Sequence, residues 1–223
     1  MKIIKKWDII PKNIDFYIHL KYNMYMEVKM KNIEILKKYI EKNNGLLFSA
    51  EVKNINIHKQ YIKLLCDEGY IERKEKGVYV KKGKNVNDFF LLQQRYKTGV
   101  FSHNTALYFY HLTDRTPLKY DLTFKNNIRL NDEMIVPHYI KEDKYEIGLT
   151  SLELEDGTTI RLYDMERTIT DILRDRNKID SQIFNTAMNE YMKKKEKNLI
   201  KLSKYAKTFK MENVLKKYME VLL

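Results

Sequence analysis

Apolar side chains recur at helical spacing in two stretches of the first half of the chain. The first stretch is "KNIEILKKYIEKNNG", residues 31–45, and the second is "INIHKQYIKLLCDEG", residues 55–69. Their apolar faces are formed by Ile33, Leu36 and Ile40 in the first, and by Ile57, Ile62, Leu65 and Cys66 in the second. A glycine ends each stretch, as is typical of helix C-termini. We therefore predict two helices, with a short third helix over residues 49–54 that Ser49 caps.

A hairpin pattern follows the second helix. In "YIERKEKGVYV" we predict strands at residues 70–73 and 78–80, joined by a polar turn at 74–77. Helix, short helix, helix and hairpin is the order of a winged helix-turn-helix. The pattern therefore predicts such a domain over residues 31–84.

The second half of the chain mixes strand and helix patterns. Residues 85–100 predict a linker helix, and Ser102 suits the cap of a helix that ends near residue 112. Strand-like runs lie at 120–124, 133–140 and 145–149. "LELEDGTTIRLYD" reads as a hairpin in which Asp156-Gly157 suits a type I′ turn. Helical patterns follow at 164–176, 181–193, 197–209 and 211–222. The whole chain is thus predicted to be α+β, with a winged helix-turn-helix followed by a mixed α+β domain, residues 101–223, that ends in helices.

The first thirty residues carry no clear amphipathic period. They contain the methionine-rich stretch "NMYMEVKMKN". We expect residues 1–30 to be a poorly structured extension, or else the product of an upstream start codon, with Met24, Met26 or Met30 as the alternative start.

Charge points to a polyanionic partner only where it is concentrated. The chain has 42 basic and 30 acidic residues, a net charge of +12. Of the basic residues 34 are Lys, a bias typical of AT-rich genomes, so the excess alone is weak evidence for DNA binding. Residues 31–84 carry 13 basic and 7 acidic side chains, a net +6. Half of the excess therefore lies in the predicted winged helix.

The apolar face of the second helix decides which side chains point outward to DNA. The candidate reader residues are His58, Lys59, Gln60, Tyr61 and Lys63. Glutamine can pair with adenine, and lysine with guanine or phosphate. The hairpin adds three candidates for phosphate contacts: Arg73, Lys74 and Lys76. Two alternatives are a winged helix used for protein contact and a solvated lysine-rich surface, and Tyr61 could equally pack into the core.

The segment "YDMERTITDILRDR", residues 163–176, resembles a catalytic site because it combines carboxylates with arginines. On a helix begun at Asp164, however, Asp171 lies four residues from Arg167 and three from Arg174. That spacing favours ion pairs within one helix, along its outer side. Met165, Ile169, Ile172 and Leu173 form the opposite, apolar stripe.

Other catalytic signatures are missing from the sequence. The five histidines are scattered, Ser102 and His103 are merely adjacent, and there is no phosphate-binding glycine motif. We predict no catalytic residues, no metal ligands and no cofactor. The competing hypothesis is that the protein is an enzyme, specifically a metal-dependent nuclease.

Several segments together resemble the AbiEi-type antitoxins of bacterial abortive-infection toxin–antitoxin pairs, which act in phage defence. Besides the winged-helix segment, they are "FSHNTALYFYHLTDRTP" (101–117), "DGTTIRLYDMERTITDILRDR" (156–176) and "LIKLSKYAKTF" (199–209). The resemblance covers residues 31–223. It departs at Asn56, where the family tends to have glycine in the turn, and asparagine tolerates the positive φ this requires.

The resemblance implies a protein with two roles. The winged helix would bind operator DNA with inverted repeats and repress its own operon. The C-terminal domain would counteract a nucleotidyltransferase-like toxin of the AbiEii type, and such type IV pairs need no stable complex. Arg115, Arg167 and Arg174 are the candidate antitoxin surface, or else they form buried salt bridges that brace the fold. The alternative function is a winged-helix regulator with an effector or partner domain and no toxin.

The sequence also favours one compartment. A single cysteine, Cys66, excludes an internal disulfide framework and fits a reducing environment. No run of about 18 apolar residues exists, so we expect no membrane span. We predict a cytoplasmic protein.

Overall fold

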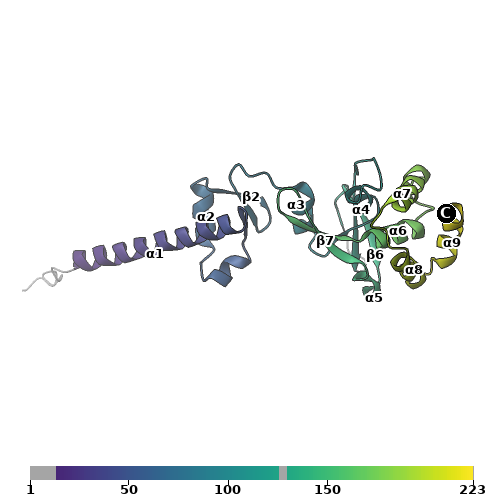
Figure 1. Ribbon diagram of the computed structural model, residues 1–223. Coiled ribbons are helices and arrows are strands. Elements are labelled where there is room, and N and C mark those ends of the chain that lie inside the picture. The colour runs from purple at the N-terminus through teal and green to yellow at the C-terminus, as the bar shows by residue number, and fades with distance from the viewer. Residues whose placement is uncertain (1–13, 126–129, 223) are drawn as a thin grey trace, which may run out of the picture. The chain divides into compact units, whose positions relative to one another are not determined.

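The chain is a mixed α+β protein that divides into two compact units, Met1–Val86 and Asn87–Leu223. The computed structural model describes residues 14–125 and 130–222 (Figure 1). Within those ranges, no helix combines the length and the apolar content that a membrane crossing requires.

The first unit packs two α-helices and a 3₁₀ helix with a small antiparallel sheet. Its elements are α1 (Ile14–Lys42), β1 (Leu46–Phe48), the 3₁₀ helix (Glu51–Ile55), α2 (Gln60–Asp67), β2 (Ile71–Glu75) and β3 (Val78–Lys81). The strand order is β1-β3-β2, and in the pairing of β1 with β3 Leu47 lies opposite Tyr79. The apolar faces of both predicted helices are buried here, with Leu36, Ile40 and Leu65 fully enclosed.

The helix ends in this unit follow the sequence signals. Asn44 and Gly45 both have positive φ, 53° and 74°, where α1 stops. Gly69, with φ 69°, ends α2, since the Tyr70 amide donates to the Leu65 carbonyl at 2.9 Å. Asn56 has φ 55° in the turn before α2. The turn therefore keeps its left-handed residue without glycine.

Two predictions for the first unit are wrong. The short helix begins at Glu51, behind Ala50, so Ser49 does not cap it; the Ser49 amide instead donates to the Gly77 carbonyl at 2.9 Å and ties this segment to the hairpin. In addition, α1 begins at Ile14 and runs unbroken to Lys42, so residues 14–30 are helical. The rest of the predicted extension, residues 1–13, lies outside the described residues.

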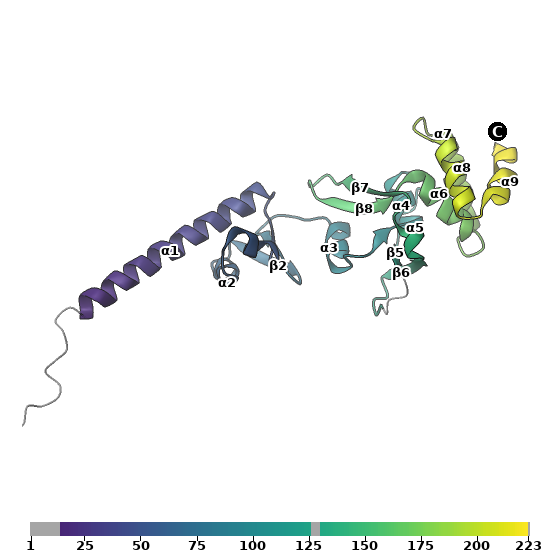
Figure 2. The same ribbon diagram turned by 90° about the horizontal axis from the view of Figure 1, so that it is seen from below.

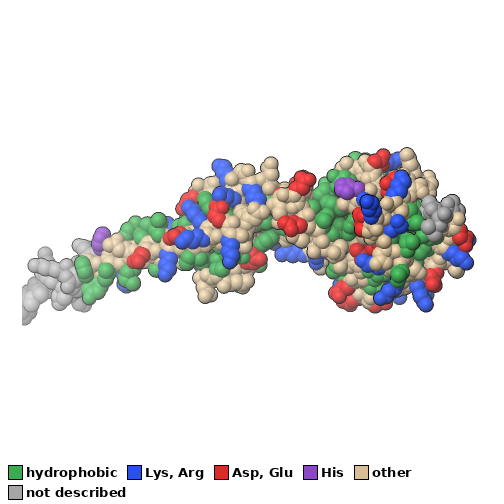
Figure 3. Space-filling model, in the orientation of Figure 1, with side chains coloured by type: hydrophobic (Ala, Val, Ile, Leu, Met, Phe, Trp, Pro, Cys, Tyr) green, Lys and Arg blue, Asp and Glu red, His purple; other side chains and the backbone are tan. Residues whose placement is uncertain are grey.

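The first half of α1 escaped prediction because its apolar residues lie on all sides of the helix. Phe16, Tyr22 and Met30, among other large apolar side chains, are exposed there, and Figure 3 shows apolar side chains along this part of the helix. A helix that is apolar all round has no amphipathic face for a periodicity argument to find.

The second unit is built on a five-stranded mixed sheet of order β6-β5-β4-β8-β7. Its strands are β4 (Val100–Phe101), β5 (Tyr120–Lys125), β6 (Ile135–Ile140), β7 (Leu149–Glu153) and β8 (Thr159–Tyr163). Its helices are α3 (Asp88–Arg95), α4 (His103–Phe109), α5 (Glu142–Tyr145), α6 (Met165–Arg174), α7 (Ser181–Lys193), α8 (Leu199–Thr208) and α9 (Glu212–Leu222). The four C-terminal helices confirm the predicted helical end.

Two strand predictions in this unit need correction. Residues 145–149 do not form a strand: Tyr145 ends α5, and only Leu149 enters β7. The β7–β8 hairpin exists, but its loop covers residues 154–158 and is not a two-residue type I′ turn. Within the loop Gly157 has positive φ, while Asp156 accepts hydrogen bonds from both the amide and the hydroxyl of Thr158.

The predicted linker helix belongs to the second unit. α3 packs on β8, because the Gln93 side chain accepts from the Arg161 amide at 2.6 Å and donates to the Arg161 carbonyl at 2.7 Å. The side-chain Nε2 of Gln93 also donates to the Gly99 carbonyl at 3.2 Å. A buried glutamine thus pairs with β8 as a strand residue would.

Helix α6 lies at the centre of the second unit. It contacts α4, α7 and α8, which gather around it in Figure 2. Its predicted apolar stripe is buried, with Ile169, Ile172 and Leu173 fully enclosed. Its polar residues are buried as well, including Glu166, Arg167 and Asp171, so the predicted outward charged side is wrong. This enclosure brings the charged residues of the segment into the interior.

Candidate functional site

The start of α2 presents a row of polar side chains to solvent. His58, Lys59, Gln60 and Lys63 are all exposed. His58 Nδ1 accepts a hydrogen bond from the backbone N–H of Gln60 at 3.2 Å. In the neutral ring the proton is therefore on Nε2. Lys59 and Lys63 form no ion pair with any described residue. Their ammonium groups are therefore available to an external anion.

Tyr61 does not belong to this row. It is 6% exposed, packs in the core of the first unit, and its hydroxyl accepts from the Asn32 amide nitrogen at 3.1 Å. On α2 it lies on the same side as Leu65, four residues later, which is fully buried. The predicted DNA contact by Tyr61 is corrected to a core position.

The β2–β3 hairpin carries the other predicted cations at its exposed end. Arg73, Lys74 and Lys76 are exposed. Lys74 pairs with Glu72 at 2.8 Å, while the Arg73 Nε group donates to the Glu75 carbonyl at 3.2 Å. Exposed pairs of this kind contribute little to stability, so breaking them to bind an external phosphate would cost little.

The three arginines predicted as one surface are not equivalent. Arg115 is exposed and donates to Gln182 Oε1 at 2.5 Å. Arg174 keeps 30% of its side chain exposed and bonds to Asp171 Oδ1 at 2.9 Å. Arg167, by contrast, is fully buried, so it cannot form part of a surface. The bracing role, given as the alternative, applies to Arg167.

Arg167 makes polar contacts through Nε and Nη1 within the second unit, while its buried Nη2 has no hydrogen-bond partner among the described residues. Its Nε donates to Asp171 Oδ2 at 3.0 Å, and its Nη1 donates to the carbonyls of Lys144 and Ile147. The guanidinium carbon lies 4.0 Å from the ring centre of Tyr163 and 4.3 Å from that of Phe209. Both rings offer the cation their negative faces. The predicted ion pair is confirmed, but in the interior.

The carboxylates at the start of α6 bind α8. Asp164 caps α6 by accepting from the Arg167 amide at 2.8 Å, as the sequence predicts. Its other oxygen accepts from Tyr205 at 3.1 Å and pairs with Lys201 at 2.9 Å. Glu166 accepts from the Asn198 amide at 3.0 Å. Two residues of the segment 163–176 therefore fix the position of α8.

The structure brings together two histidines that are far apart in the sequence. The rings of His103 and His138 stack with centroids 3.5 Å apart and planes 11° from parallel. Asp175 Oδ2 lies 3.3 Å from His103 Nε2 and 3.6 Å from His138 Nδ1. The histidines are scattered along the sequence, but two of them are neighbours in the fold, so the prediction that they form no cluster is wrong. Separation along the chain carries no information about which strands pair.

Neighbouring groups change the acidity of this cluster. Burial lowers the pKa of His138, but hydrogen bonds to Asp121 and Asp175 outweigh it and raise that pKa to about 9. Hydrogen bonds from His103 and His138 lower the pKa of Asp175 well below its ordinary range. Ser102 does not cap α4 with its side chain; its hydroxyl oxygen accepts from Thr123 at 2.8 Å and lies 3.0 Å from His103 Nδ1.

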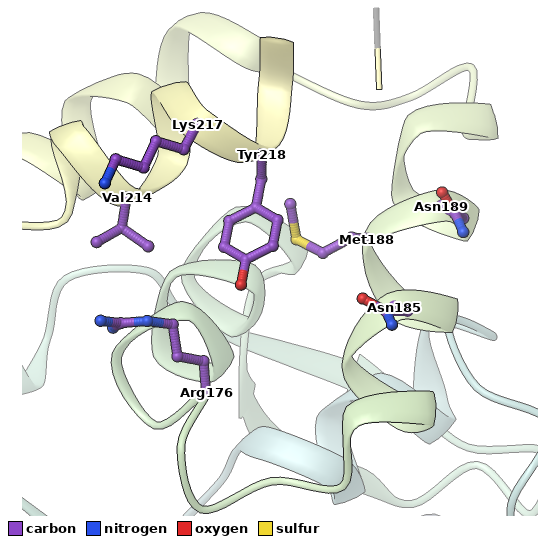
Figure 4. A pocket seen from close by; sticks show the side chains of 7 residues that line it. All are labelled: Arg176, Asn185, Met188, Asn189, Val214, Lys217 and Tyr218. Atoms are coloured by element: carbon purple, nitrogen blue, oxygen red, sulfur yellow. The ribbon is translucent and has the colours of Figure 1, made fainter. Parts of the chain in front are cut away.

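A cavity of the second unit lies between α7, α9 and the C-terminal end of α6. Its volume is about 580 Å³, and Figure 4 shows Tyr218 pointing from α9 into its middle. Asn185 and Asn189 on α7 and Arg176 after α6 line it with polar groups. The sequence prediction named none of these residues as a site, since their positions become neighbours only when the helices pack.

Neither a family model nor a curated protein matches the chain.

Replacing Arg167 tests its bracing role. We expect Arg167→Met to lower the free energy of unfolding by about 3–5 kcal/mol, because Asp171 loses its buried partner. Arg174→Met removes the same charge from a partly exposed position and is expected to cost about 1 kcal/mol or less. Urea unfolding followed by circular dichroism measures both. Equal losses in the two variants would contradict the assignment.

Proposed function

We propose that the protein is a DNA-binding transcriptional autorepressor and an antitoxin. The first unit binds operator DNA with inverted repeats, and the second unit counteracts a nucleotidyltransferase-like toxin of the AbiEii type. The proposal places the chain with the AbiEi-type antitoxins and assigns it no catalytic activity of its own. It acts in the cytoplasm, where its operon is transcribed.

The observation that carries the DNA-binding role is the exposed polar row at the start of α2. Lys59, Gln60 and Lys63 project from a helix whose opposite side, at Ile62 and Leu65, is buried. The N-terminal residues of a recognition helix are those that contact base edges in the major groove. Glutamine there can pair with adenine, and the lysines with guanine or phosphate.

The hairpin supports the same role. α1, the 3₁₀ helix and α2, followed by β2 and β3, have the order of a winged helix-turn-helix. Arg73, Lys74 and Lys76 at the exposed end of the hairpin suit the phosphate backbone, which positions a protein on DNA without reading its sequence. A bulge between Arg73 and Glu75 alters the twist of this strand just before the turn.

Support for the antitoxin role comes from the segments that carry the resemblance. They supply β4, α4, β8, α6 and α8, the elements around Arg167 and the histidine cluster. Arg115 and Arg174 remain accessible in this unit and are the arginines that we assign to a partner surface. A regulator without a toxin would use the first unit in the same way. The product of the neighbouring gene distinguishes the two functions, because a nucleotidyltransferase-like protein encoded there supports the antitoxin role.

Replacing the two free lysines of α2 tests the DNA-binding role. We expect Lys59→Ala/Lys63→Ala to reduce binding to the DNA upstream of its own gene at least 10-fold in a gel shift, because two groups that contact base edges or phosphate are lost. The matched control is Lys38→Ala/Lys42→Ala, which removes two exposed lysines at the same spacing from α1. The control is expected to bind as the unaltered protein does.

Equal weakening in both double variants would show that only net charge matters. That result, or unchanged binding by the α2 variant, would refute the reader helix.

Separating the two units tests the antitoxin role. We expect residues 87–223 to lose repression of a reporter but to rescue growth when co-expressed with the neighbouring toxin. Residues 1–86 are expected to bind DNA and to give no rescue. Rescue by residues 1–86 alone would reverse the assigned roles.

A further inference from the structure

Three ligand-type side chains converge from separate elements of the second unit. His103 begins α4, His138 lies on β6, and Asp175 follows the last turn of α6. One nitrogen of each ring and one oxygen of Asp175 all lie within 4.8 Å of one another. Asp175 Oδ2 is nearest, 3.3 Å from His103 Nε2 and 3.6 Å from His138 Nδ1. The second distance is too long for a strong hydrogen bond.

The other nitrogen of each ring is already engaged by the fold. His138 Nε2 lies 2.7 Å from Asp121 Oδ1, and His103 Nδ1 lies 3.0 Å from the Ser102 hydroxyl. Asp121 is itself fixed, because its amide donates to Thr105 at 2.8 Å. When an ion displaces the protons that the other two nitrogens direct at Asp175, a proton stays on each engaged nitrogen and the lone pairs of the other two face the ion. Histidines that bind metal are typically oriented in this way by a carboxylate or another polar group behind them.

We infer that His103, His138 and Asp175 form a site for a divalent transition-metal ion, with Zn²⁺ as the natural probe. Imidazole nitrogens and a carboxylate are ligands that this class of ion prefers. The inference goes beyond the proposed function and does not depend on it. Three protein ligands leave a fourth position open to water, on the side of a cavity of about 280 Å³ that the same three residues line.

Charge favours an ion of this kind. Asp121 and Asp175 place two negative charges around the cluster, and a divalent cation that displaces the ring protons would balance them. The nearby cations are already paired: Arg174 with Asp171 at 2.9 Å and Lys178 with Asp175 at 3.5 Å. Lys178 is exposed, so its ammonium group can move away as the ion enters.

Binding requires a small rearrangement. Two rings that are 3.5 Å apart and 11° from parallel cannot both direct an in-plane lone pair at one point. An ion about 2.0–2.1 Å from both nitrogens therefore needs the rings to splay. The adjoining cavity provides room for that movement. The bound ion would then link α4, β6 and the end of α6, so metal binding should stabilise the second unit.

The test uses the full chain after removal of metal with a chelator. Titration with Zn²⁺ against a chromophoric indicator is expected to show one site per chain, and Zn²⁺ is expected to raise the melting temperature by several degrees. His138→Ala and His103→Asn should each weaken Zn²⁺ binding at least 10-fold. Asparagine is chosen because His103 has φ 45°, which alanine tolerates poorly. Asp121→Asn should weaken binding less, since it only orients His138.

The matched control is His19→Ala/His58→Ala, which removes two exposed imidazoles from the first unit. It should leave the affinity and the melting shift unchanged, and circular dichroism should show that every variant keeps its secondary structure. Co²⁺ should give visible absorption bands that His138→Ala abolishes. Absence of a 1:1 site, binding that survives His103→Asn/His138→Ala, or binding lost in the control would each overturn the inference.

Discussion

The fold of the second unit depends on a charged group that it encloses completely. Arg167 is fully buried on α6, and a guanidinium in the protein interior is costly unless its charge is compensated. Asp171 and two backbone carbonyls accept from its Nε and Nη1, and two aromatic rings face its charge, whereas its buried Nη2 has no hydrogen-bond partner among the described residues. Those partners come from α6 itself, from α5 and the segment before β7, from β8 and from the residue after α8. One side chain therefore fixes how four parts of the chain meet.

Close packing around Arg167 also explains a glycine. Gly148 has φ 77°, and a Cβ atom there would lie 2.6 Å from Arg167 Cβ. The backbone must pass this close for the Ile147 carbonyl to accept from the guanidinium at 2.7 Å. The conformation of the segment after α5 thus depends on the arginine that it covers. The segment 163–176, which contains this arginine, therefore has a structural role in the fold.

The two units differ in what their charged residues do. In the first, the cations at the start of α2 and on the hairpin are exposed, as an interface with a polyanion requires. In the second, charged residues of α6 are buried and tie helices to one another, while Arg115 and Arg174 stay accessible. This contrast is consistent with the proposed division, in which the first unit would bind nucleic acid and the second would present a surface to another molecule.

Local signals predicted the elements better than the site. Helix ends at Gly45 and Gly69, the Asp164 cap and the apolar stripe of α6 follow from periodicity and backbone preferences that act within a few residues. Tyr61 was assigned to the wrong side because a tyrosine suits either side of a half-buried helix. The burial of Arg167 and the meeting of His103 with His138 depend on which strands pair. Phe101 of β4 and Leu162 of β8, for example, are 61 residues apart in the sequence but are paired in the sheet. No window of sequence contains that information.

The salt dependence of DNA binding by residues 1–86 tests the central claim most directly. Fluorescence anisotropy with the DNA upstream of the gene should give nearly the affinity of the full chain, with a logarithm of the binding constant that falls linearly with the logarithm of salt concentration. Neutralising about four to six phosphates predicts a slope of roughly −4 to −5. Binding that needs residues 87–223, or that does not change with salt, would contradict the account.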